Sequence, residues 1–203
     1  MSPEASTSTT PVSRDAISRF VEQQDWISPG VEKSIQGAIT STVDTLGGDS
    51  LRNFLYGQWM DVPLHAVLTD VPIGSWTATI AFDAIATISG DSKFNSAADA
   101  ANMLGLAAAS VTAITGLNDW SGIDKPAPRR IGLVHGLLNV AATGLFLSSC
   151  IARRRDNRST GRALAALGYL VVTASAHLGG SLVYEHGIGV NLVDEKPRSD
   201  DNG

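Results

Sequence analysis

The stretch that decides the fold is residues 131–151, which read IGLVHGLLNVAATGLFLSSCI. It holds no Asp, Glu, Lys or Arg, and arginines flank it at positions 129, 130, 153, 154 and 155. Because an α-helix rises about 1.5 Å per residue, about 20 such residues cross the hydrocarbon core of a bilayer. A helix of a soluble protein would carry a polar face along its length. The stretch therefore predicts a transmembrane helix in an integral membrane protein.

Three further apolar segments accompany it, at about 63–89, 98–118 and 162–184. Short polar turns separate the four segments, and short connections favour antiparallel neighbours. We therefore predict an all-α fold, an integral membrane up-down four-helix bundle. A soluble all-α bundle is the alternative, favoured only by the first segment, which carries Asp70, Pro72 and Asp83. The other long segments, almost free of charge, argue against it.

Polar segments flank the bundle. Residues 1–13 are rich in Ser, Thr and Pro, which predicts disorder, and residues 193–203 form a polar tail. Residues 14–60 carry apolar positions at helical spacing, which predicts an amphipathic helical arm with an interfacial helix near Trp59. Residues 61–192 then form the four-transmembrane-helix domain. The first 20 residues have no apolar core, so we expect no cleaved signal peptide.

The composition excludes several functions. The net charge is −5 and no basic stripe is interleaved with aromatic residues, so nucleic-acid binding is not expected. Cys150 is the only cysteine, which rules out an intrachain disulfide and any multi-cysteine iron–sulfur or zinc site within the chain. The sequence reveals no nucleophile paired with a base, so we do not expect an enzyme.

The ionisable residues of the helices gather toward one membrane side. We define the terminal face as the side that bears both termini and the turn at 119–130. The opposite side carries the arginine-rich turn at 152–162, and the bias of Lys and Arg predicts that this turn is cytoplasmic and the termini are outside. At the helical rise, His65, Asp70, His135 and His177 all fall in the half of the bundle next to the terminal face.

Side-chain stripes predict a pocket in that half. His135 and Asn139 share one stripe, and small or polar stripes face inward in membrane bundles. We expect the pocket to be lined by Asp70, His135, Asn139 and His177, with His65 at its mouth. Supporting residues of this pocket would be Gly179 and Gly180 beside His177, and Asp119, whose carboxylate would orient a histidine.

Several uses of the pocket are open. His135 and His177 could ligate a b-type haem as two axial imidazoles. Alternatively, His135 and His177 with Asp70 or His65 could bind a divalent metal. A proton relay or small transporter is weaker, because no inverted repeat is evident. Finally, the polar stripe could serve only to pack the helices, with no cofactor bound.

Four stretches of the chain resemble a known family in the same order. They are PLHAVLTDVPIGSWTATIAFD at 63–83, GLNDW at 116–120, GLVHGLLNVAA at 132–142 and HLGGSLVYEHGIGVN at 177–191. Together they resemble the DUF2231 family of predicted bacterial membrane proteins, over roughly residues 50–192. Members often have a His-Pro pair where this chain has Val62-Pro63, which weakens a ligand role for His65.

The resemblance implies a multi-pass protein of the bacterial cytoplasmic membrane. Some members carry a Rieske-type iron–sulfur domain, which implies a link to electron transfer. We therefore expect the lipid bilayer and a separate Rieske or other redox protein as partners, and a homo-oligomer is compatible with the sequence. The leading hypothesis is a redox-associated subunit that binds haem b or a metal, and the alternative is a non-enzymatic membrane scaffold or anchor.

Overall fold

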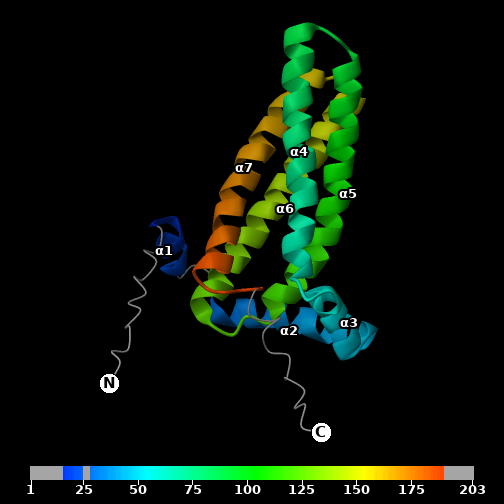
Figure 1. The fold of residues 1–203 in the computed structure, drawn as a ribbon. Helices are drawn as coiled ribbons and strands as arrows, with labels where there is room; N and C mark the ends of the chain where they lie inside the picture. Colours follow the sequence, from blue (N-terminus) through cyan, green and yellow to red (C-terminus); the bar gives the residue numbers. More distant parts are fainter. Residues whose placement is uncertain (1–15, 25–27, 190–203) are drawn as a thin grey trace, which may run out of the picture.

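The computed structural model describes residues 16–24 and 28–189, and the elements of this part of the chain are helices (Figure 1). Four long helices form the body: α4 (Leu64–Ser89), α5 (Lys93–Ser121), α6 (Pro126–Arg154) and α7 (Arg158–Tyr184). They run alternately up and down, which confirms the predicted all-α four-helix bundle. The predicted disordered residues 1–13 and polar tail 193–203 lie outside the described residues.

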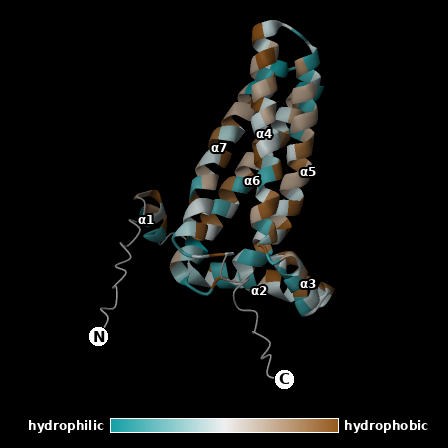
Figure 2. Ribbon diagram, in the orientation of Figure 1, coloured by the Kyte–Doolittle hydropathy of each residue, from teal (hydrophilic) through white to brown (hydrophobic). Residues whose placement is uncertain are grey.

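The four helices are long and apolar enough to cross a membrane. α4 coincides with its predicted apolar segment, whereas α5, α6 and α7 extend beyond theirs because flanking polar residues remain helical. α6, for example, begins at Pro126, a residue suited to the first turn of a helix. Large apolar side chains are exposed on the outside of the bundle, among them Ile88, Val140 and Leu170. Hydrophobic residues recur along all four long helices (Figure 2). Exposing such a large apolar surface to water would be unfavourable, whereas the acyl chains of a bilayer can cover it.

The bundle consists of two helical hairpins with matching register. α4 packs mainly on α5, and α6 packs mainly on α7. Residues of the first hairpin have counterparts in the second at a constant offset along each helix pair, and most counterparts are buried alike. The pairs are His65/His135, Trp76/Phe146 and Asp83/Arg153 on α4 and α6, and Gly105/Gly168, Thr112/Ser175 and Gly116/Gly179 on α5 and α7. The two hairpins run in the same direction, so this repeat is parallel and not inverted.

Counterpart residues meet where the hairpins join. The rings of Trp76 and Phe146 stack with centroids 4.2 Å apart and planes inclined by 3°. Each ring lies against a glycine of its own hairpin: a methyl group on Gly105 would come within 2.4 Å of Trp76, and one on Gly168 within 3.0 Å of Phe146. The absence of two side chains therefore lets the aromatic rings reach the centre of the bundle.

A buried ion pair lies nearer the arginine-rich turn. The guanidinium of Arg153 donates two hydrogen bonds to the carboxylate of Asp83, and both side chains are almost fully buried. Arg153 also donates to Asp99 at 3.1 Å, and Arg162 lies 3.5 Å from Asp83. Asp99 and Arg162 occupy equivalent positions in the two hairpins, as Asp83 and Arg153 do. The Arg153–Asp99 and Arg162–Asp83 contacts are therefore equivalent too. Asp83 thus binds both Arg153 and Arg162.

Short helices form a platform across the terminal face (Figure 1). They are α1 (Ala16–Glu22), α2 (Pro29–Leu46), α3 (Gly48–Tyr56) and the 3-10 turn η1 (Gln58–Met60). Glu32 of α2 accepts a hydrogen bond from Arg129 of α6 at 3.0 Å, with both side chains buried. The amide of Gln36 donates to the carbonyls of Trp120 and Ile123 at the end of α5. These bonds attach the platform to the transmembrane helices through polar groups that would otherwise be unpaired.

We expect Asp83→Asn to destabilise the bundle by about 3 kcal/mol, because it removes one partner of a buried ion pair. The measurement is unfolding of detergent-solubilised protein. Asp70→Asn is the matched control, since Asp70 lies on the same helix but is exposed. Equal stability of the two variants would contradict a structural role for the Asp83–Arg153 pair.

Candidate functional site

His135 of α6 is held by two neighbours. Its Nδ1 lies 2.8 Å from the backbone carbonyl of Ser175 on α7, and its Nε2 lies 3.0 Å from the side-chain amide nitrogen of Asn139. A carbonyl can only accept, so Nδ1 carries the proton and donates it. Nε2 then accepts from Asn139, one helical turn along α6. The predicted stripe of His135 and Asn139 is therefore one hydrogen-bonded unit, and both ring nitrogens are engaged.

His65 of α4 is held in the same way by α5. Its Nδ1 lies 3.1 Å from the carbonyl of Thr112 and 3.3 Å from the hydroxyl of Thr115. Because the Thr115 hydroxyl donates its own proton to the Thr112 carbonyl, at 2.8 Å, Nδ1 of His65 must be a donor. Its Nε2 accepts from no group in the part of the chain that the structure describes. His65 and His135 thus have the same tautomer and the same kind of backbone partner.

Two glycines make room for the imidazoles. A methyl group on Gly116 would lie 2.7 Å from Cε1 of His65, and one on Gly179 would lie 3.0 Å from Cε1 of His135. Each ring therefore rests on the backbone of the partner helix. The repeat thus brings one histidine from each hairpin to the same level of the bundle.

Pro72 shapes α4 close to His65. Proline has no N–H, so the carbonyl of Leu68 one turn earlier loses its helical hydrogen bond. The hydroxyl of Thr112 on α5 donates to this carbonyl at 3.2 Å. The same hydroxyl also lies 2.9 Å from the carbonyl of Ala108, so its hydrogen bond is divided between two acceptors. The same threonine thus bonds the carbonyl freed by Pro72 with its hydroxyl and His65 with its own carbonyl. The sequence assigns Thr112 an inward-facing position one turn before Gly116, but no part in the predicted pocket.

The structure places the other predicted pocket residues elsewhere. His177 of α7 and Asp70 of α4 have exposed side chains, whereas Ser175 and Leu178 of α7 are buried. The structure therefore brings together His135, Asn139 and Gly179, with His65 nearby, but shows neither His177 nor Asp70 in contact with them. His177 has an interaction of its own. Gly180 has only Tyr184 within reach of an added methyl group.

Asp119 lies at the end of α5, near Tyr56 of the platform. Its Oδ1 atom is buried and accepts no hydrogen bond, so it does not orient a histidine in this structure. Within residues 16–24 and 28–189, no group of three or more His, Cys, Asp or Glu side chains has an arrangement that could hold a metal ion. The donor set near His135 is therefore limited to imidazoles, amides and hydroxyls.

Comparison with known proteins supports the resemblance seen in the sequence. The profile of the DUF2231 family, described as predicted membrane proteins, matches residues 61–192. This chain belongs to the DUF2231 family. The matched region contains all four long helices and both histidine sites, so this DUF2231 protein is a multi-pass membrane protein. No curated protein and no solved structure matches the chain.

We expect Gly116→Ala to destabilise the protein by about 1–3 kcal/mol, because the added methyl group overlaps His65 and must displace it. Gly136→Ala is the control, since nothing lies within 4 Å of a methyl group at that position of α6. Alanine favours a helix over glycine, so the control should be neutral or stabilising by up to about 1 kcal/mol. Thermal unfolding in detergent measures both, and equal effects would argue against close packing of His65.

Proposed function

We propose that this DUF2231 protein is a non-enzymatic membrane scaffold or anchor subunit whose intramembrane polar groups hold its helices together. The observation that carries the proposal is His135, whose two ring nitrogens are both hydrogen-bonded within the bundle. Unsatisfied polar groups are costly in hydrocarbon, and interhelical hydrogen bonds remove that cost. The buried cluster of Asp83 and Arg153 serves the same purpose at the other end.

A second candidate is a redox-associated subunit that binds haem b or a metal. It is favoured by the Nδ1 hydrogen bonds of His65 and His135 to backbone carbonyls, an arrangement that commonly orients ligating histidines. The Nε2 lone pair of His65 would be available to iron, while that of His135 would have to exchange its bond from Asn139. A ligand role for His177, or for a set including Asp70, would require these exposed side chains to meet a group outside the bundle core.

We infer further that the protein resides in the bacterial cytoplasmic membrane, with the arginine-rich turn inside and the terminal face outside. The support is the excess of arginine at the turn between α6 and α7. A scaffold in that orientation would present the platform of α1–α3 to partners outside the cytoplasm. A separate Rieske or other redox protein is the partner that the second candidate requires.

The optical spectrum of purified protein separates the two candidates, recorded oxidised and then dithionite-reduced, with metal analysis of the same sample. We expect no Soret band and no stoichiometric metal after expression with haem and metal supplied. We also expect His135→Ala to lower the stability of the bundle by about 1 kcal/mol while the protein still inserts.

The opposite outcome has a defined pattern. A Soret band with sharp reduced bands, lost in His135→Ala and in His65→Ala, would replace the scaffold by an electron-transfer subunit. Loss in His177→Ala instead would assign the ligand role to the exposed histidine of α7. His135→Ala removes packing as well as an imidazole, so Asn139→Ala serves as a comparison. It releases Nε2 of His135 but leaves the imidazole itself in place.

A further inference from the structure

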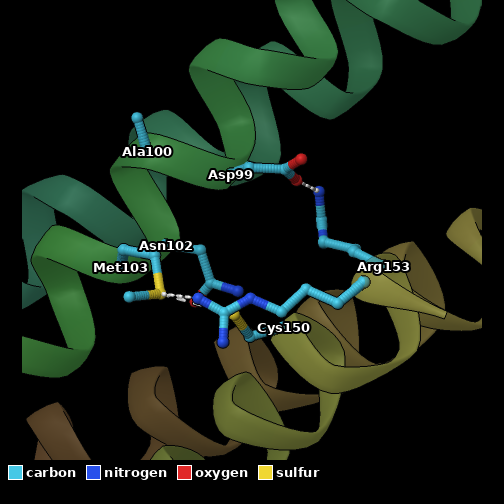
Figure 3. Close-up of a pocket in the computed structure, with 7 residues that line it drawn as sticks. Asp99, Ala100, Asn102, Met103, Cys150 and Arg153 are labelled. Atoms are coloured by element: carbon cyan, nitrogen blue, oxygen red, sulfur yellow. Dashed lines mark hydrogen bonds and ion pairs between the residues drawn. The ribbon is translucent and has the colours of Figure 1, made fainter. Parts of the chain in front are cut away.

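A cavity of about 260 Å³ lies between the first turns of α5 and the last turn of α6 (Figure 3). It is lined by Asp99, Ala100, Asn102, Met103, Cys150, Arg153 and Arg154. Arg154 is the last residue of α6, and α6 crosses the bilayer. The cavity mouth is therefore at the level of the membrane interface, on the side opposite the terminal face.

Most charges around this cavity neutralise one another. Arg158 binds both carboxylate oxygens of Asp99, at 3.0 and 2.7 Å, and Arg153 adds a third hydrogen bond to the same carboxylate. Arg153 is further neutralised by Asp83. The negative charge of Asp99 is thus neutralised by two arginines, so it does not repel an anion from the cavity.

Arg154 is the exception among the lining residues. Its guanidinium contacts the sulfur of Met103 at 3.6 Å, and it has no ion pair in the part of the chain that the structure describes. A thioether is only a weak acceptor and cannot neutralise a positive charge. A guanidinium can donate two parallel hydrogen bonds to two oxygens of a phosphate. Arg154 therefore places a phosphate-binding group without an anionic partner among the described residues at the cavity.

The remaining walls suit a lipid more than a free ion. Cys150 and Met103 form an apolar side, with their sulfur atoms 3.4 Å apart. Leu104 and Leu147 are exposed on the outer surfaces of α5 and α6 on the bilayer side of the mouth. Asn102 donates its amide to the carbonyl of Phe146, and its buried oxygen Oδ1 has no hydrogen-bond partner. A hydroxyl group of a lipid headgroup is a donor suited to such an oxygen.

We propose that this cavity binds the headgroup of an anionic phospholipid, with the phosphate on Arg154 and the acyl chains along the apolar surfaces of α5 and α6. Basic pockets between transmembrane helices at the interface bind anionic headgroups in this way. The proposal is independent of the scaffold function, because it concerns the opposite end of the bundle from the histidines.

The test is native mass spectrometry of the full chain in mild detergent, titrated with phosphatidylglycerol. We expect Arg154→Ala to weaken binding of the first lipid about fivefold, the effect of one basic residue near an anionic headgroup. Arg155→Ala and Lys125→Ala remove the same charge, one in the next residue and one at the far end of α6, and should leave binding nearly unchanged. Arg154→Lys keeps the charge and should restore most of the affinity.

Three results would overturn the proposal. Equal weakening by Arg154→Ala and Arg155→Ala would mean a diffuse attraction to the basic turn. Equal affinity for phosphatidylcholine would mean that the anionic charge is not recognised. Displacement of the lipid by millimolar inorganic phosphate would mean that the cavity takes free phosphate. The Arg154→Lys variant keeps the first result interpretable if Arg154→Ala reduces the yield of folded protein.

Discussion

The buried ion pair between Asp83 and Arg153 is the constraint on which the arrangement of the bundle depends. Both groups lose their hydration when the hairpins join, and charged partners across the junction offset that loss. Arg162 adds a second cation beside Asp83, and Asp99 adds a second carboxylate beside Arg153. A slip of one residue along either helix would leave two charges unpaired at membrane depth, which is costly. The pair therefore sets the register of α4 against α6, and the stacked rings of Trp76 and Phe146 fit that register.

Toward the terminal face the polar contacts change character. Nδ1 of His65 bonds to α5 and Nδ1 of His135 bonds to α7, so each imidazole is held within its own hairpin. Near the arginine-rich turn, by contrast, the charged groups bond across the junction between hairpins. Ion pairs thus join the two hairpins at the end near the arginine-rich turn. At the terminal face the histidines bond within their own hairpins, and the platform helices attach through Glu32 and Gln36.

Hydropathy was enough to predict the four helices, because a bilayer requires an apolar surface on every side that meets lipid. Helical spacing was also enough to join His135 with Asn139, four residues apart. It was not enough to orient His177. An amphipathic helix of a soluble protein shows its outward side by its polar face, but a helix that is apolar all round has no such face. We therefore predicted that His177 of α7 faces the core, whereas its side chain is exposed. The repeat is hard to recognise in the sequence because several counterparts differ in residue type, as Trp76 and Phe146 do.

The opposite charges of the counterparts Asp83 and Arg153 also determine which hairpins can recognise each other. Two copies of the α4–α5 hairpin, joined in the same geometry, would bring one carboxylate against another. Two copies of the α6–α7 hairpin would likewise oppose two guanidinium groups. Like charges in contact at low dielectric repel strongly. The fold therefore selects the pairing of unlike halves within one chain over the exchange of equivalent halves between chains during insertion.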